Sequence, residues 1–375
     1  LPKIEETDTD ASVLVLCVPT RHETPETAYR QVRALSERAA ELHIGCIFKK
    51  TDSALRGNVG AELAAVLDGS GERELFFIPA LPAMDRVTIH GIHYINGVPV
   101  HESVFGVDPF EPVTESYIPA LLKKQMREPV EVITGATPPA PVNSGKRIAV
   151  LDCETQSGME KLTRTLYETG RLHAVAGCSG QAEALAAALC GNTGESEAEP
   201  ETERLTVVCG SMNPISLEQM AYAEKMGYAA VSVPVERLLE TGLESAEGKA
   251  FLDALWAEYS ENEHLLIDTG AANAAHGELP EEIGKSVASL LGAILKDILD
   301  RGAGSRLMII GGDTLLGFMD AIGCRELSPR REILQGVVES EYIYRGVRHS
   351  VLSKSGGFGQ TDLLLRLESE APVHA

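Results

Sequence analysis

The sequence predicts an α/β protein built from two doubly wound, mainly parallel domains. Short apolar runs alternate with amphipathic helical patterns along both halves of the chain, which is typical of parallel sheets covered by helices. The length of 375 residues exceeds what one hydrophobic core ordinarily supports. A stretch rich in Gly and Pro, residues 135–145, interrupts the alternation and indicates a connection between domains. We therefore predict a first domain over residues 1–143 and a second over residues 144–375.

In the first half, apolar composition predicts five strands, at residues 12–18, 44–48, 74–78, 87–94 and 130–134. Pro25 suits the first turn of a helix expected from Thr24 to Leu42. Apolar spacing predicts a second helix from Val59. Asn96-Gly97 is a dipeptide favoured by tight hairpin turns, so the chain should reverse there.

In the second half, five further apolar runs are predicted strands: residues 147–151, 205–209, 229–233, 265–268 and 307–310. Helical patterns follow at residues 183–189, from 217, at 283–298 and from 315. The apolar helix over 283–298 leaves room for a homodimer. These elements repeat the strand–helix alternation of the first half, which supports the same class of fold.

Composition excludes several classes of protein. The net charge of −22, from 33 basic and 55 acidic residues, disfavours nucleic acid as a partner. No apolar run approaches the roughly 20 residues that span a bilayer, so we expect no membrane segment. The seven cysteines show no C-x-x-C spacing, and most lie in apolar runs. Free thiols in a reducing compartment are the simplest explanation, and we expect a cytoplasmic protein.

The polar turn after residues 44–48 is the first candidate site. It holds a dense set of hydrogen-bond donors just where a strand gives way to a helix: Lys49, Lys50, Ser53, Arg56 and Asn58, with Asp52 among them. Such a set suits a small anion that also carries hydroxyl groups. Backbone N–H groups at the start of the following helix can face the same anion. The alternative is an ordinary solvated loop.

Three small-residue turns in the second half form the second candidate site. Each follows an apolar run: Gly210-Ser211, Gly311-Gly312-Asp313-Thr314 and Lys354-Ser355-Gly356-Gly357-Phe358-Gly359. Glycines at such turns let backbone approach a ligand, and a nucleotide laid across the carboxyl ends of parallel strands needs this arrangement. Taken singly, the second turn is also explained by a capped tight turn and the third by a glycine-rich hairpin.

Other motifs do not support a site. Gly284-Lys285-Ser286 resembles the end of a P-loop, but Leu279 stands where the required glycine would be, so we expect helix surface there. His90 and His93 are three residues apart on a predicted strand and face opposite sides, which excludes a shared zinc ion with His101. His93, beside the hairpin, could still contact a ligand.

The motifs also carry a resemblance to a known family. Lys50-x-Asp52-Ser53-x-x-Arg56-Gly57-Asn58-x-Gly60 is followed by a second motif from Pro79 to Pro99 that includes Arg86, His93 and Asn96-Gly97. Asp108-Pro109-Phe110, Thr114-Glu115-Ser116 and the three glycine turns then follow in order. This ordered set, from about residue 12 to residue 366, resembles the four-carbon acid sugar kinases, the ATP-dependent threonate, erythronate and 3-oxo-tetronate kinases.

The resemblance implies a sugar-acid domain, a nucleotide domain and an active site in the cleft between them. ATP would be the phosphoryl donor, with Mg²⁺. The implied catalytic residues are Asp52 as base and Arg56 as anion clamp. The implied substrate-binding residues are Lys50, Ser53, Asn58, Arg86 and His93. The implied nucleotide-binding residues are Ser211, Gly311, Gly312, Thr314, Gly356, Gly357 and Asp313, the last holding Mg²⁺ through water.

One departure leaves two expectations open. The family begins with a strand followed by Asp-Asp-x-Thr-Gly-Ala, and nothing before Ser12 matches it. Either the sequence lacks an upstream segment, or it is a paralogue without activity that keeps its binding sites. A two-lobed sugar-acid binding protein therefore stays as the alternative to a kinase. A nicotinamide dehydrogenase is disfavoured, because no Gly-x-Gly-x-x-Gly turn follows an early strand.

Overall fold

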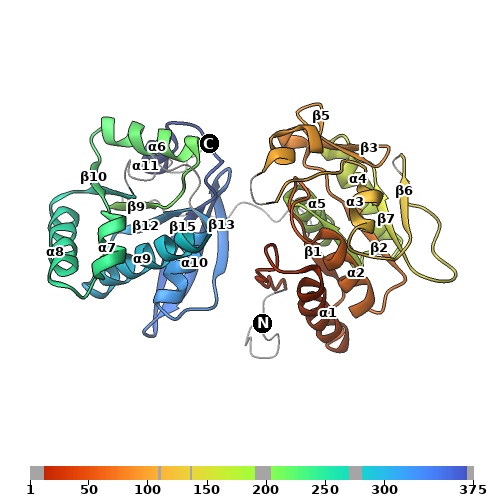
Figure 1. Cartoon of the computed structure of the whole chain (residues 1–375), viewed down its shortest axis with the longest axis horizontal. Coiled ribbons are helices and arrows are strands. Elements are labelled where there is room, and N and C mark those ends of the chain that lie inside the picture. Colours follow the sequence, from red (N-terminus) through yellow and green to blue (C-terminus); the bar gives the residue numbers. More distant parts are fainter. Residues whose placement is uncertain (1–11, 109–110, 136, 191–203, 270–280, 370–375) are drawn as a thin grey trace. The chain divides into compact units, whose positions relative to one another are not determined.

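The structure, a computed structural model, describes residues 12–108, 111–135, 137–190, 204–269 and 281–369. The chain divides into two compact units, Leu1–Gly194 and Glu195–Ala375 (Figure 1). No helix within these described ranges is long and apolar enough to cross a membrane.

The first unit is built on a five-stranded parallel sheet in the order β1-β8-β2-β7-β6. Its strands are β1 (Ile47–Lys50), β2 (Glu74–Ile78), β6 (Val130–Ile133), β7 (Arg147–Leu151) and β8 (Ala174–Gly177). Apolar residues alternate between the two faces of β2 and are fully buried on both. Leu75 and Phe77 lie in one core cluster, and Phe76 and Ile78 in the other. A strand buried on both faces has a continuous apolar sequence, and this pattern predicts β2.

Helices cover both faces of this sheet. The cluster around Leu75 and Phe77 is completed by α1 (Pro25–Glu41), α2 (Val59–Gly69) and α3 (Ile118–Lys123). The opposite cluster is completed by α4 (Gln156–Glu168) and α5 (Ser179–Cys190). Thr24 caps α1 by accepting a hydrogen bond from the Thr27 N–H, and Pro25 occupies the first turn as predicted.

A small antiparallel sheet is formed by the three strands that follow β2 in the chain: β3 (Arg86–Ile89), β4 (Ile92–Ile95) and β5 (Val98–Pro99). The predicted turn at Asn96-Gly97 is confirmed, with φ of 51° and 79°. A second turn of the same kind, His90-Gly91 with φ of 52° and 73°, splits the predicted strand 87–94 in two. The 3₁₀ turns Pro82–Met84, Val100–Glu102 and Val104–Val107 flank this sheet in the chain.

The second unit is built on a seven-stranded sheet in the order β10-β11-β9-β12-β15-β14-β13. The first five strands in this order are parallel, and β14 and β13 continue the sheet antiparallel. The strands are β9 (Leu205–Cys209), β10 (Ala229–Ser232), β11 (His264–Asp268), β12 (Arg306–Ile310), β13 (Ser328–Leu334), β14 (Val337–Tyr344) and β15 (Val347–Lys354).

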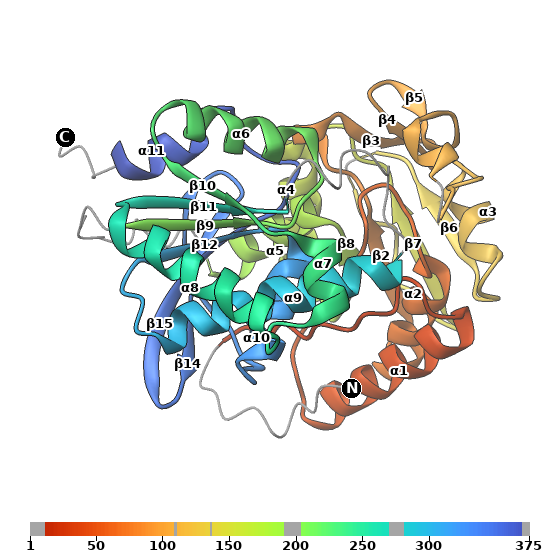
Figure 2. The ribbon, with the colours of Figure 1, turned by 60° about the vertical axis from the view of Figure 1, so that its left-hand side comes forward.

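Helices again lie on both faces (Figure 2). One face packs against α7 (Val235–Thr241), α8 (Ala246–Glu261), α9 (Glu281–Asp300) and α10 (Gly312–Ala321). The other packs against α6 (Pro214–Lys225) and α11 (Leu363–Ser369). The predicted class, two doubly wound and mainly parallel α/β domains, is confirmed. Lys285 and Ser286 lie exposed on α9, as predicted for helix surface.

Two predictions about the first unit are wrong. The boundary predicted at residues 143/144 would separate strands that pair with each other, because β7 lies between β2 and β6 and β8 lies between β1 and β2. The structure divides the chain at Gly194/Glu195 instead. The strand predicted at 12–18 is not formed: Val13 and Val15 are 66% and 84% exposed, and the segment pairs with no described strand.

Candidate functional site

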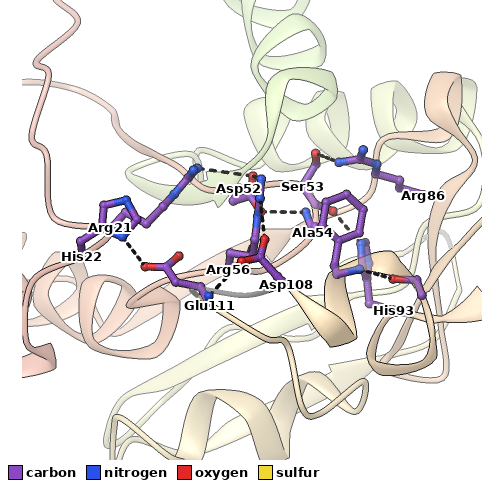
Figure 3. A network of polar contacts seen from close by, with 12 residues as sticks. Arg21, His22, Asp52, Ser53, Ala54, Arg56, Arg86, His93, Asp108 and Glu111 are labelled. Atoms are coloured by element: carbon purple, nitrogen blue, oxygen red, sulfur yellow. Dashed lines mark hydrogen bonds and ion pairs between the residues drawn. The ribbon is translucent and has the colours of Figure 1, made fainter. Parts of the chain in front are cut away.

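The turn between β1 and α2 is organised by the carboxylate of Asp52. Its Oδ2 accepts hydrogen bonds from the Ala54 N–H at 3.2 Å and from Arg56 Nε at 3.0 Å, and its Oδ1 lies 3.5 Å from Nη2 of Arg21 (Figure 3). Burial by itself would raise the pKa of the Asp52 carboxyl, but hydrogen bonds and charge from Arg56, with the charge of Arg21, lower it below its ordinary value. A carboxylate held this way is a poor proton acceptor, so the arrangement does not favour Asp52 as a base.

Arg56 and Arg86 both reach one aromatic ring. Their guanidinium carbons lie 5.1 and 5.2 Å from the centroid of Phe105, within the range of cation–π attraction. Arg56 also pairs with Asp108, at 3.2 Å between Nη1 and Oδ2. The sequence predicts no role for Phe105 or Asp108. Asp108 stood in a motif of the resemblance, whereas nothing in the sequence pointed to Phe105.

Ser53 connects Arg86 to His93. The Ser53 hydroxyl accepts a hydrogen bond from Nη1 of Arg86, and the Ser53 carbonyl lies 2.8 Å from Nε2 of His93 (Figure 3). Nδ1 of His93 lies 3.2 Å from the Thr88 hydroxyl. Arg86 forms no ion pair with any carboxylate in the described part of the chain. Its guanidinium therefore keeps capacity for an anion.

The structure corrects two predicted substrate contacts. His93 is fully buried, and burial lowers its pKa to about 4, so it is a neutral support beneath Ser53 and cannot touch a ligand. Asn58 is 6% exposed, and its amide donates to the carbonyls of Thr20 at 2.9 Å and Glu23 at 2.7 Å. Asn58 therefore fixes the chain before α1 instead of offering its side chain to a hydroxyl group.

Lys50, Ser53 and Arg86 remain as the candidate anion-binding side chains, at the carboxyl edge of the sheet. Lys50 is exposed at the end of β1, and its register partner is Gly177 at the end of β8. Gly177 also pairs with Ile78 at the end of β2. Helix α5 begins two residues later, so its first N–H groups lie at this edge between β1 and β2.

A cavity of about 310 Å³ lies on another side of the same turn. Its lining includes Arg21, Arg56, Gly57, Glu111 and Lys124, but not Lys50, Ser53 or Arg86. His22 pairs with Glu111 there, at 3.0 Å between Nδ1 and Oε1. The cavity places the carboxylate of Glu111 beside Arg56, whose guanidinium Asp52 already occupies, so the cavity suits an anion less well than the sheet edge does.

In the second unit, the three small-residue turns meet at one edge of the sheet. Cys209, Ile310 and Lys354 end β9, β12 and β15 in direct register. The turns are joined by backbone hydrogen bonds, from the Gly210 N–H to the Ile310 carbonyl at 3.2 Å and from the Gly311 N–H to the Lys354 carbonyl at 2.9 Å. Each turn follows a strand, and the strand order brings the three turns to one edge.

Close packing explains the glycines. A Cβ on Gly210 would lie 2.1 Å from the Thr314 hydroxyl, and a Cβ on Gly356 would lie 2.2 Å from the Ser211 hydroxyl. Gly311 has a φ of 117°, which only glycine adopts readily. Thr314 is 3% exposed, and its hydroxyl packs between the turns at Gly210 and Gly311. The buried hydroxyl is therefore not placed to contact a ligand.

The start of α10 offers donors to an anion. Gly312, Asp313 and Thr314 are its first three residues, and their N–H groups donate to no acceptor in the described part of the chain. The Asp313 side chain is exposed and fits a contact to Mg²⁺ through water. Gly357 lies beside Asn213, whose amide nitrogen would be 3.5 Å from an added Cβ. No described cluster of three or more His, Cys, Asp or Glu residues could hold a metal ion by itself.

Fold and sites together define a two-unit α/β protein, with a donor-rich turn at the carboxyl edge of the first sheet and three small-residue turns at the carboxyl edge of the second. Family models agree: residues 2–185 match a sugar-binding N-terminal domain, and residues 206–364 match a nucleotide-binding C-terminal domain. The chain belongs to the four-carbon acid sugar kinase family.

Three curated relatives and two solved structures are similar over nearly the whole chain. A D-threonate kinase of Salmonella typhimurium is 25% identical over 94% of this chain and 87% of its own. A D-erythronate kinase of Heliobacterium modesticaldum is 26% identical (93% and 85%), and a 3-oxo-tetronate kinase of Methylobacterium radiotolerans is 28% identical (90% and 82%). Structures from Haemophilus influenzae and Salmonella typhimurium share the fold, with 19% and 22% identity and TM-scores of 0.72 and 0.73; they cover 94% and 95% of this chain and 88% of each neighbour.

Proposed function

We propose that this protein transfers the γ-phosphoryl group of ATP, with Mg²⁺, to a hydroxyl group of a four-carbon sugar acid, the terminal hydroxyl being the expected acceptor. The observation that carries the proposal is the pair of sheet edges: Lys50 and Arg86, which form no ion pair with a described carboxylate, in one unit, and three joined glycine turns in the other. The names of the relatives, which act on threonate, erythronate and 3-oxo-tetronate, support the substrate class.

In this function the planar fork of Arg86 and the ammonium of Lys50 bind the acid's carboxylate, with Ser53 donating or accepting beside them. Arg56, oriented by Asp52 and Asp108, adds positive charge near the reacting groups. ATP supplies the phosphoryl group. Phosphoryl transfer depends more on positioning and charge neutralisation than on covalent help from the protein, so a turn rich in fixed cations suits it.

The N–H groups that open α10 would hold phosphate oxygens, and Asp313 would contact Mg²⁺ through water. Ser211, Gly356 and Gly357 would border the remainder of the nucleotide. The protein would act without a membrane or nucleic-acid partner; a cytoplasmic location and a homodimer remain predictions from the sequence.

A second candidate, a sugar-acid and nucleotide binding protein without turnover, is favoured by one observation. Asp52, the carboxylate of the turn, would be the base, but Arg56 and Arg21 lower its pKa and make it a poor proton acceptor. Formation of ADP should be measured with threonate, erythronate and 3-oxo-tetronate, alongside calorimetric binding of each acid. Acid-dependent ADP formation supports the kinase. Binding of acid and ATP without ADP supports the second candidate, and binding of neither ligand contradicts both.

A further inference from the structure

Lys354 is a buried cation that the proposed reaction does not use. It ends β15, is 3% exposed, and forms no ion pair with a described carboxylate. Its Nζ instead donates to three backbone carbonyls of the loop that follows it: Ser355 at 3.0 Å, Gly356 at 3.3 Å and Phe358 at 2.9 Å. Burying an ammonium without a counter-charge is costly, so these carbonyls act as its solvation shell.

The same contacts fix the direction of the loop's N–H groups. In a planar trans peptide the C=O and the following N–H point opposite ways, and no described peptide bond is cis. Three carbonyls turned toward Nζ therefore turn the N–H groups of Gly356, Gly357 and Gly359 away from it. None of these three N–H groups donates to an acceptor in the described part of the chain.

Side chains from α6 hold the loop in this form. The Ser216 hydroxyl donates to the Gly356 carbonyl at 2.7 Å, and the Gln219 amide donates to the Phe358 carbonyl at 3.0 Å. Both residues are fully buried. These carbonyls thus have their donors on one side of the loop, while its N–H groups point away from that side. Neighbouring backbone N–H groups without an acceptor are able to bind an anion.

We propose that Lys354 is a positioning residue for the nucleotide: its ammonium gathers the loop carbonyls inward and so presents the N–H groups of Gly356, Gly357 and Gly359 to phosphate. The proposal rests on the proposed function, in which this loop faces ATP. Lys354 itself does not touch the nucleotide.

If Lys354 positions the loop, nucleotide affinity should fall as its ammonium loses a proton near pH 8. Burial lowers the pKa of Lys354 to about 8, with Cys209 opposing the shift. Cys209, on β9, is the described titratable group acting on it, and burial raises the pKa of that thiol to about 11, so the thiol stays neutral near pH 8. Ser216 and Gln219, which face Lys354 from α6, do not titrate. A neutral amine has one donor fewer than the three carbonyls require, so the loop loosens above pH 8.

The test measures the dissociation constant of a non-hydrolysable ATP analogue by calorimetry between pH 7 and pH 9.5. For the wild type we expect a constant value to about pH 8, then weakening of up to tenfold per pH unit. Lys354→Met keeps the length of the side chain without donors; we expect binding at least tenfold weaker at pH 7 and no break near pH 8. Lys225→Met, at the exposed end of α6, is the matched control and should behave as the wild type.

A flat wild-type profile, or unchanged binding by a folded Lys354→Met variant, overturns the proposal. If the variant does not fold, the wild-type profile alone decides, with a break near pH 8 in favour and its absence against. Failure of the wild type to bind the analogue at any pH would instead overturn the proposed function. Affinity for the sugar acid, which belongs to the first unit, should not change in the variant.

Discussion

Arg56 and Arg86 share the ring of Phe105 but differ in their partners. Arg56 is bound to the carboxylates of Asp52 and Asp108, whereas Arg86 has the hydroxyl of Ser53. An arginine between two carboxylates stabilises the turn, and removing it takes one charged partner away from each of them. An arginine that forms no ion pair with a described carboxylate still has guanidinium N–H groups that can donate to an anion. These partners indicate different roles for the two side chains: Arg56 stabilises the turn, and Arg86 is the better candidate for an anion contact.

Arg86→Lys should weaken binding of the sugar acid by about 10- to 100-fold, because one bidentate charged contact is worth about 1.5–3 kcal/mol. The melting temperature should change little. Arg56→Lys should lower both the melting temperature and the affinity for the acid. Calorimetry with threonate or erythronate and thermal melting measure the two effects, and Arg30→Lys on the exposed face of α1 is the control. A large loss of stability in Arg86→Lys with unchanged affinity would place the anion elsewhere.

The position of this turn could be predicted from the sequence, but its internal contacts could not. The donors are adjacent in the chain, so their density is visible without a structure. Which side chains already have partners depends on contacts made in the folded chain. Asn58 donates to the carbonyls of Thr20 and Glu23, and His93 on β4 contacts Thr88 on β3 and the Ser53 carbonyl. Sequence patterns do not record such pairings, and for that reason both residues were assigned to the substrate.

At the scale of elements, strands buried on both faces could be predicted because their composition alone is distinctive. Strand β8 was missed, because Ala174–Gly177 consists of small residues that give no strong apolar run. Strands β13 and β14 were missed because charged residues such as Arg331, Glu332 and Glu339 interrupt them. Residues 12–18 show the opposite case: their apolar composition predicts a strand, but they pair with no described strand.

Helix α10, which begins at the Gly311–Thr314 turn, packs closely against α9, and glycines make this approach possible. A Cβ on Gly292 would lie 2.2 Å from the carbonyl of Gly317, and one on Gly317 would lie 2.2 Å from the carbonyl of Ala288. Gly292→Ala should therefore destabilise the second unit by about 1–3 kcal/mol. Because α10 begins at the turn that contains Thr314, nucleotide affinity should fall as well.

Gly284→Ala on the same helix is the matched control, since nothing lies within 4 Å of an added Cβ there. It should stabilise the protein by about 0.5–1 kcal/mol through helix propensity alone. Urea unfolding of both variants checks the prediction. Equal effects of the two substitutions would show that α9 and α10 do not pack as closely as described.

At the scale of the whole molecule, the division at Gly194/Glu195 has a direct consequence for fragments. Residues 204–375 contain all seven strands of one sheet and both of its core clusters. Residues 144–375 also contain β7 and β8 with α4 and α5, but not the strands β1, β2 and β6 with which β7 and β8 pair. The added elements would expose apolar faces and unpaired edges.

We therefore expect the fragment 204–375 to unfold cooperatively and to be stabilised by ATP with Mg²⁺, since a ligand that binds only the folded state raises its melting temperature. The fragment 144–375 should aggregate or melt at a lower temperature, because fully buried residues such as Val150, Val175 and Met159 lose their neighbours. Circular dichroism and thermal melting, with and without nucleotide, compare the two. A fragment 144–375 that is soluble and melts higher would mean that β7 and β8 belong with the second sheet. A folded fragment 204–375 that ATP does not stabilise would show that the three glycine turns are insufficient for nucleotide binding.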